Sequence, residues 1–141
     1  MKLVVASDER TALTDFVVDW LKSKGHQLIL RGILGNPPTD RWVEIGKEAA
    51  FMVAEGKVER GILFCWSGTG VCMAANRIKE ARAALCWSSE IARLSRKWDN
   101  ANILCLALVD TKEEIVREII DAFLQTEFNE EGLNEADKLD T

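Results

Sequence analysis

The sequence has one histidine, no excess of positive charge and no long apolar segment. No two of its four cysteines have the CxxC spacing of a zinc site, and no pair of histidines is available to complete one. No apolar run approaches the roughly 20 residues that a membrane helix needs. The formal net charge is −5, and no basic cluster offers the footprint of a nucleic-acid-binding protein. These absences argue against a zinc site, a membrane span and a nucleic-acid partner.

The 141 residues are enough for one domain with a proper core, and too few for two. Residues 1–8 reach an acidic side chain too early for a signal peptide and predict a first strand. We therefore expect a cytoplasmic protein without disulfides. The net charge is carried by residues 126–141, which hold six acids and one base. We assign 1–128 to a single α/β domain and 129–141 to an acidic C-terminal tail, which we expect to be solvated.

Segments typical of strands and helices alternate along the whole domain. The predicted strands are 2–7, 26–30, 60–64, 81–86 and 101–108. The predicted helices are 12–24, 41–55, 71–77, 88–97 and 111–125. Ser88 or Ser89 is the expected N-cap of the fourth helix, and Thr111-Lys112-Glu113-Glu114 the expected capping box of the fifth. Such alternation predicts a five-stranded parallel sheet with helices on both faces, although the strand order does not follow from the sequence.

The most distinctive stretch is Cys65-Trp66-Ser67-Gly68-Thr69-Gly70-Val71, which lies between a predicted buried strand and a predicted helix. Its two glycines allow the backbone to curl and expose N–H groups, and the start of a helix adds partial positive charge. This field favours a thiolate over a thiol at Cys65 and can hold a substrate oxyanion. No lysine follows Gly70, which excludes a Walker-type phosphate loop. The other three cysteines lie in apolar runs and are interpreted as core residues.

The carboxyl ends of parallel strands meet at one edge of a sheet, where α/β proteins bind ligands. Asp8 and Glu9 follow the first strand and Cys65 follows the third, so we expect all three at this edge. The only histidine begins the second strand, at the opposite edge, and is interpreted as structural. A thiolate and a carboxylate beside an oxyanion-binding turn suit proton abstraction next to a carbonyl group. Two alternatives remain open: Asp8 could cap a loop, and Ser67 and Thr69 could serve only to shape the turn.

Together these residues resemble the family of type B ribose-5-phosphate isomerases and galactose-6-phosphate isomerase subunits, and the resemblance extends to about residue 128. Its markers are Ser7-Asp8, Arg60-Gly61-Ile62-Leu63, Cys65 with Ser67-Gly68-Thr69-Gly70, Ala74-Ala75-Asn76-Arg77, Arg82-Ala83-Ala84-Leu85-Cys86, Asp99-Asn100-Ala101-Asn102, Asp121-Ala122-Phe123-Leu124 and Thr126-Glu127-Phe128. Trp66 replaces a commoner glycine, which indicates a divergent branch of the family.

The resemblance implies a Rossmann-like three-layer α/β/α sandwich and a homodimer with active sites at the interface. It implies that Cys65 moves a proton between C1 and C2 of an opened sugar, while Asp8 contacts sugar hydroxyls. Ser67 and the backbone of Gly68-Thr69-Gly70 would hold the enediolate oxygens. The implied partner is a small sugar or sugar phosphate, with no cofactor and no metal ion.

Several departures from the family concern the substrate site. Trp98 stands where the family has its ring-opening histidine, Glu9 where it has a second histidine, and Arg41 where a tyrosine lines the sugar pocket. The phosphate-binding arginines correspond to Val109 and to residues 132–137, which contain no arginine. The residues assigned to substrate binding are Glu9, Arg41, Gly68, Thr69, Gly70, Trp98 and Asp99.

Three functional hypotheses follow. The first is an aldose–ketose isomerase acting on a sugar other than ribose 5-phosphate, including unphosphorylated sugars. The second is a sugar-phosphate isomerase with a relocated phosphate site. The third is a non-catalytic carbohydrate-binding or interaction protein that retains the fold. The intact Cys65 and glycine turn favour Cys-mediated proton transfer through an enediolate, whereas the missing ring-opening histidine favours the third hypothesis.

Overall fold

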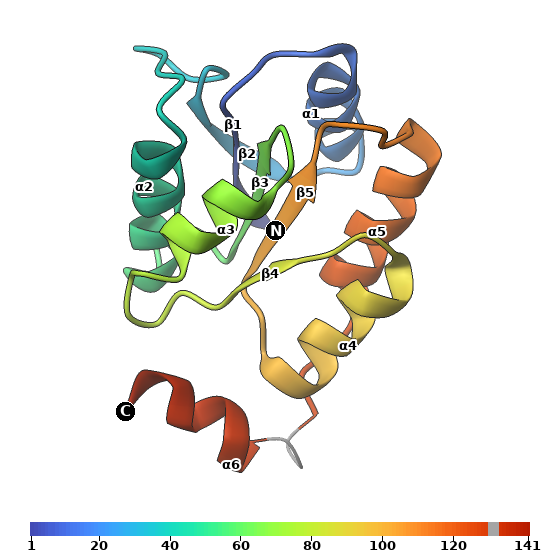
Figure 1. Cartoon of the computed structure of the whole chain (residues 1–141). Coiled ribbons are helices and arrows are strands. Elements are labelled where there is room, and N and C mark those ends of the chain that lie inside the picture. The colour runs from blue at the N-terminus through green and yellow to red at the C-terminus, as the bar shows by residue number, and fades with distance from the viewer. Residues whose placement is uncertain (130–132) are drawn as a thin grey trace.

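The chain folds into an open parallel sheet covered by helices on both faces (Figure 1). The structure is a computed structural model that describes residues 1–129 and 133–141. Its strands are β1 (Lys2–Ser7), β2 (Gln27–Gly32), β3 (Arg60–Cys65), β4 (Ala83–Leu85) and β5 (Ile103–Ala107). Its helices are α1 (Ala12–Ser23), α2 (Trp42–Ala54), α3 (Thr69–Ala75), α4 (Ser89–Asp99), α5 (Glu113–Gln125), α6 (Leu133–Ala136) and the 3-10 helix η2 (Asp137–Asp140). None of the described helices has the length and apolar character needed to cross a membrane.

The strands lie in the order β2-β1-β3-β5-β4, and every neighbouring pair is parallel. From β1 the chain proceeds to β2 on one side and then to β3 on the other, so the direction of winding reverses between β1 and β3. Such a switch point is where open α/β sheets bind ligands. The predicted three-layer α/β/α sandwich is confirmed, and the order adds the position of its switch point.

Two apolar layers bury the sheet. Helices α1, α4 and α5 cover one face, and α2 and α3 cover the other, as Figure 1 shows. Side chains alternate along each strand, so in β3 Ile62 and Phe64 belong to the first layer while Leu63 and Cys65 belong to the second. The Cys65 side chain therefore lies on the α2–α3 face, at the carboxyl end of its strand.

Two arginines join the C-terminal end of α5 to the rest of the domain. Arg60 donates to the Phe123 carbonyl at 2.7 Å, and Arg96 donates to the carbonyls of Ala101 at 2.6 Å and Thr126 at 3.2 Å. Both guanidinium groups lie over the Phe123 ring, 5.8 and 6.0 Å from its centroid. Arg96 is only 5% exposed, and burial lowers its pKa to about 10. These bonds satisfy carbonyl groups that the end of a helix leaves without partners.

The C-terminal segment packs on the domain, at the bottom of Figure 1, with α6 against α4. Asp140 accepts a hydrogen bond from the Glu80 backbone N–H at 2.8 Å, and its second oxygen lies 3.0 Å from Arg82 Nη1. The Arg82 and Asp140 side chains are 19% and 25% exposed, so the ion pair is largely shielded from water. The expectation of a solvated tail is therefore wrong for Asp140, because partners 58 and 60 positions earlier in the chain lie within reach. Glu135 and Asp137 are exposed, as expected.

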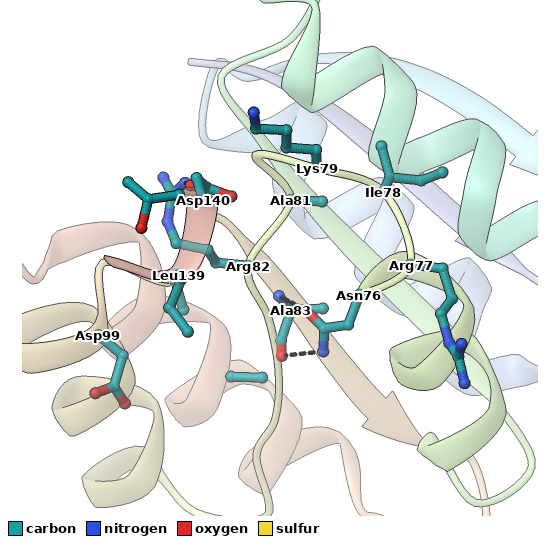
Figure 2. A pocket seen from close by; sticks show the side chains of 13 residues that line it. Asn76, Arg77, Ile78, Lys79, Ala81, Arg82, Ala83, Asp99, Leu139 and Asp140 are labelled. Atoms are coloured by element: carbon teal, nitrogen blue, oxygen red, sulfur yellow. Dashed lines mark hydrogen bonds and ion pairs between the residues drawn. The ribbon is translucent and has the colours of Figure 1, made fainter. Parts of the chain in front are cut away.

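Strand β4 forms one edge of the sheet and is shorter than the predicted strand 81–86. The Arg82 N–H donates to the Asn102 side chain rather than to a neighbouring strand, so pairing begins only at Ala83. On its outer side, the Asn76 amide accepts from the Ala83 N–H at 2.8 Å and donates to the Ala83 carbonyl at 2.9 Å (Figure 2). This side chain occupies backbone groups that an open edge would otherwise present to another chain.

The two predicted helix caps have different outcomes. Ser88 caps α4, accepting from the Ile91 N–H at 3.2 Å, as expected. The capping box predicted at the start of α5 is wrong. The Thr111 hydroxyl donates to the Val109 carbonyl at 2.9 Å, and Lys112 is the N-cap without a side-chain hydrogen bond. The Thr111 hydroxyl, which was expected to cap the helix, is therefore bound within the local turn instead.

Candidate active site

Asp8 and Cys65 lie on neighbouring strands at the switch point. Ser7, the last residue of β1, pairs with Phe64 of β3, and the Asp8 N–H donates to the Phe64 carbonyl at 3.3 Å. Asp8 therefore leaves the sheet directly beside Cys65, the last residue of β3. The expectation that both residues lie at the carboxyl edge is confirmed, and the strand order adds that β1 lies next to β3.

The Cys65 side chain is almost buried, with 5% of its surface exposed. It packs with the apolar layer under α2 and α3, while its carbonyl accepts from the Leu108 N–H at 3.0 Å. Strand pairing places Cys65 opposite Ala107 of β5. The thiol is thus shielded from bulk water at the carboxyl end of β3. Shielding of this kind strengthens electrostatic interactions with a bound substrate.

The glycine turn connects Cys65 to α3 and is held by its own hydroxyls. Gly68 has a left-handed backbone, with φ of 76°, and a Cβ there would lie 2.8 Å from the Leu106 carbonyl carbon. The position therefore requires glycine on two grounds. The Ser67 and Thr69 hydroxyls lie 2.6 Å apart, and the Thr69 N–H donates to Ser67 Oγ at 3.3 Å. These bonds show that both hydroxyls shape the turn, and a role toward substrate would be additional.

Asp8 places a carboxyl group at this edge of the sheet. Its Oδ1 atom is buried and has no hydrogen-bond partner among the described residues. Burial raises the Asp8 pKa above its usual value, and the negative charges of Glu9 and Asp40 raise it further. A hydrogen bond with its own backbone lowers the Asp8 pKa and partly offsets this rise, so the loop-capping alternative stands beside a ligand-binding role. A buried carboxyl oxygen without a partner is typical of a site that binds a ligand.

The loop after β2 lies beside the glycine turn and Asp8. Trp42, the first residue of α2, lies on Gly70, because a Cβ on that glycine would be 2.9 Å from the indole ring. Arg41 is the exposed N-cap of α2 and has no ion-pair partner among the described residues. Asp40 precedes it and acts on Asp8 through its charge. Trp42 and Asp40 were not foreseen in the sequence, because only the pairing of β2 with β1 brings this loop to the site.

Trp98 and Asp99 do not join this group within one chain. They end α4, and the chain then enters β5 at its amino end, whereas Cys65 pairs with Ala107 at the carboxyl end. Asp99 instead borders a cavity of about 680 Å³ together with Arg82 and Leu139 (Figure 2). The full length of β5 therefore separates both residues from the thiol of their own chain.

The remaining predicted positions are located as follows. Glu9 is exposed beside Asp8, and Val109 follows β5 at the same edge of the sheet. Of the positions 132–137 compared with the family's arginines, Gly132 lies outside the described residues. His26 precedes β2 at the opposite edge, as expected, and its buried Nδ1 has no hydrogen-bond partner in the described part of the chain. Among the described residues, no three histidine, cysteine, aspartate or glutamate side chains are arranged to hold a metal ion.

The other three cysteines are not all inert core residues. Burial raises the pKa of Cys86 to about 11 and raises that of Cys105 strongly, so both favour the neutral thiol. Cys72, on α3, is only partly buried, and its interaction with the Cys105 thiol lowers its pKa. The interpretation of Cys72 as a simple core residue is therefore incomplete, because α3 is an edge helix that leaves one flank open.

The fold and this edge define a doubly wound α/β protein with a thiol, a carboxyl group and a glycine turn at its switch point. Comparison with known proteins gives the family. Residues 3–141 match the family model described as Ribose/Galactose Isomerase. The chain belongs to this family, and the predicted resemblance is confirmed.

Individual relatives agree. The chain is 32% identical over 130 residues to the D-erythrulose-4-phosphate isomerase of Pectobacterium atrosepticum. The matched region covers 91% of this chain and 83% of that protein. It is 34% identical over 112 residues to the galactose-6-phosphate isomerase subunit LacB of Clostridium acetobutylicum, covering 79% of this chain and 64% of that subunit, a little under two thirds of its length. The ribose-5-phosphate isomerase B structure from Clostridium thermocellum has a TM-score of 0.90 at 33% identity, covering 99% of this chain and 95% of that one.

Proposed function

We propose that the protein is an aldose–ketose isomerase that acts on a sugar phosphate or a related sugar. The observation that carries the proposal is the position of Cys65 beside Asp8 at the β1–β3 switch point, next to a glycine turn that opens α3. Family membership supports the reaction class, since the relatives described above are named as sugar-phosphate isomerases.

In this proposal the Cys65 thiolate takes the proton from C2 of the open-chain aldose. The C2–H electrons form the C1–C2 double bond, and the C1 carbonyl oxygen takes up negative charge as an enediolate. Ser67 and the backbone N–H groups of Gly68-Thr69-Gly70 stabilise that charge. Asp8, whose pKa is raised by burial, exchanges a proton with a sugar hydroxyl. The thiol then returns its proton to C1, where the C1–C2 double-bond electrons form the new C–H bond. The C2 hydroxyl gives up its proton to become the ketose carbonyl, and the C1 oxygen takes up a proton to become a hydroxyl.

A second copy of the chain would complete the site. Trp98 and Asp99 cannot reach the thiol of their own chain, because they lie at the far edge of the sheet. Both belong to the substrate-binding set suggested by the resemblance, together with Glu9 and Arg41. A homodimer would bring the end of α4 in one chain against the sheet edge that carries Cys65 in the other. Trp98 and Asp99 could then bind substrate although they lie far from the thiol of their own chain. Trp98 is 42% exposed, so its indole is available for such a contact.

The test is proton exchange in heavy water. Aldoses and their phosphates are incubated with the protein, and deuterium at C2 is measured by NMR. We expect exchange with at least one sugar and its loss, by three or more orders of magnitude, in Cys65→Ser. Cys72→Ser is the matched control, because this thiol lies on α3 outside the turn and should leave exchange intact.

Two results would contradict the proposal. Full exchange in Cys65→Ser would remove the thiolate from the mechanism. No exchange with any sugar, accompanied by ligand-dependent quenching of tryptophan fluorescence, would instead favour a non-catalytic carbohydrate-binding protein.

A further inference from the structure

A second cavity, of about 610 Å³, lies at the carboxyl ends of β4 and β5 and under the first turn of α5. We call it the β4–β5 cavity. Its volume falls within the range of small-molecule sites, about 300–1,000 Å³. It lies on the same edge of the sheet as Cys65 but over the strands on the other side of β3. No step of the proton transfer described above uses it.

The β4–β5 cavity has an apolar floor and an aromatic wall. Leu106 and Ile119 of the core form its floor, each no more than 1% exposed. Trp87 and Ile115 border it with 68% and 41% of their surfaces exposed. Two large, exposed apolar side chains beside one cavity favour a ligand that covers them.

The charge of the cavity does not suit phosphate. Among the described residues that line it, Lys112 carries the one positive charge, and Asp110 and Glu114 carry negative charges. A bound dianion needs several cationic or N–H partners, and two carboxylates beside the single lysine would oppose it. The same carboxylates, with the Ser67 and Thr111 hydroxyls, accept hydrogen bonds from neutral hydroxyl groups.

The cavity is continuous with the proposed reaction site through two residues. Ser67 belongs to the glycine turn and also lines the cavity. Ala107 lines it as well, and pairs with Cys65 in the sheet, which sets their backbones about 5 Å apart. A substrate lying along the carboxyl edge can therefore have its reacting carbons over β1 and β3 and its far end over β5 and β4.

We propose that the β4–β5 cavity is the distal subsite of the isomerase and that it holds a neutral sugar ring. The ring is a glycosyl substituent on the open-chain aldose, with its C–H face on Trp87 and its hydroxyls toward the polar rim. The inference rests on the proposed isomerase function and adds to it the class of substrate: an aldose that carries an uncharged ring at its far end in place of phosphate.

The experiment compares three probes in the heavy-water exchange assay: glucose, cellobiose and glucose 6-phosphate. Cellobiose adds a neutral ring to glucose, and glucose 6-phosphate adds a charge. We expect kcat/KM to be highest for cellobiose. In Trp87→Ala, the ratio of kcat/KM for cellobiose to that for glucose should fall roughly tenfold, as expected for losing one aromatic contact. Phe51→Ala, which removes an aromatic side chain 50% exposed on α2, is the matched control and should leave the ratio unchanged.

A second variant tests the role of charge. Val109→Arg places a cation in the cavity wall and should shift preference from cellobiose toward glucose 6-phosphate by about tenfold or more. Its fold is checked by the urea midpoint, so that a loss of all activity is not taken for a change of specificity.

The outcomes separate the two proposals. Exchange that is fastest with glucose 6-phosphate and insensitive to Trp87→Ala would overturn the distal subsite while leaving the isomerase intact. If no probe exchanges, saturation-transfer NMR of cellobiose with the protein decides: binding that Trp87→Ala abolishes supports the cavity as a sugar site. Absence of binding would overturn the subsite as well.

Discussion

The two edges of the sheet handle polar groups in opposite ways. At the carboxyl edge, Asp8 has a buried oxygen without a partner among the described residues, and its pKa is raised. At the amino side, the charged side chains are matched: the buried guanidinium of Arg96 is bound to carbonyls, and Arg82 is paired with Asp140. The exception there is the buried Nδ1 of His26, which has no hydrogen-bond partner in the described part of the chain. Unmatched polar groups cost stability, whereas matched ones preserve it. The difference between the charged groups supports the proposal that the carboxyl edge binds a ligand, whereas the arginines of the amino side stabilise the fold.

Removing Arg96 should have the largest effect on stability. Arg96→Ala leaves the Ala101 and Thr126 carbonyls without their donor and removes packing on Phe123. We expect a loss of about 3 kcal/mol in the free energy of unfolding, measured by urea denaturation. Arg93→Ala, on the exposed side of the same helix, is the control and should cause no measurable change. Equal effects of the two substitutions would show that the buried bonds contribute nothing.

Gly68→Ala should damage the carboxyl edge. The left-handed φ and the approach to Leu106 together should cost about 2 kcal/mol of stability. Because the turn must shift, kcat/KM in the exchange assay should fall by about a hundredfold. Gly25→Ala is the matched control, since Gly25 also has a positive φ, of 89°, but nothing lies within 4 Å of its added Cβ. It should lose about half as much stability and keep full activity; a similar loss of activity there would contradict the assignment of the turn.

Releasing the C-terminal segment should have a smaller effect. Asp140→Ala removes the acceptor of the Glu80 N–H and the partner of Arg82. We expect a loss of about 1 kcal/mol and roughly tenfold faster hydrogen exchange at the Glu80 amide. Asp137→Ala, an exposed neighbour in the same 3-10 helix, should change neither. Unchanged exchange at Glu80 in Asp140→Ala would mean that the segment does not protect this amide.

Asp8→Asn should slightly stabilise the fold while weakening the enzyme. Because the pKa of Asp8 is raised in the folded chain, its ionised form is disfavoured there, and this cost is greatest above the folded pKa. The cost fades as the pH falls, and it is absent below the usual value of 3.8, where both states are protonated. The variant should therefore unfold at a higher urea concentration than the wild type at pH 7, with the difference shrinking toward pH 4.

The control for this prediction is Asp19→Asn, on the exposed side of α1, which should show no such pH dependence. A variant at position 8 that is equally stable or less stable at pH 7 would argue against an unmatched carboxylate.

The alternation of strands and helices, the Ser88 cap and the glycine turn could be predicted because their causes are local. Side-chain periodicity, cap residues and glycines act within a few positions of the chain. The failed capping box at Thr111 has an equally local origin, since its hydroxyl donates to the Val109 carbonyl and accepts no helix N–H. The prediction that the C-terminal residues are solvated failed at Asp140 for a different reason. Their negative charge suggested contact with water, but Asp140 pairs with Arg82, which lies far earlier in the chain.

The sequence by itself determined the fold class, the family and the identity of the turn that carries Cys65. Only the tertiary structure decided that Asp8 emerges beside that thiol and that Trp98 and Asp99 lie at the far edge. It also decided that Asp40 acts on Asp8 and that Trp42 lies against Gly70. Local propensity sets which segments become strands, whereas the order β2-β1-β3-β5-β4 depends on how whole apolar faces pack across the sheet. Residues distant in sequence become neighbours only through that order. The sequence therefore identified some of the candidate site residues, but their positions relative to one another came only from the fold.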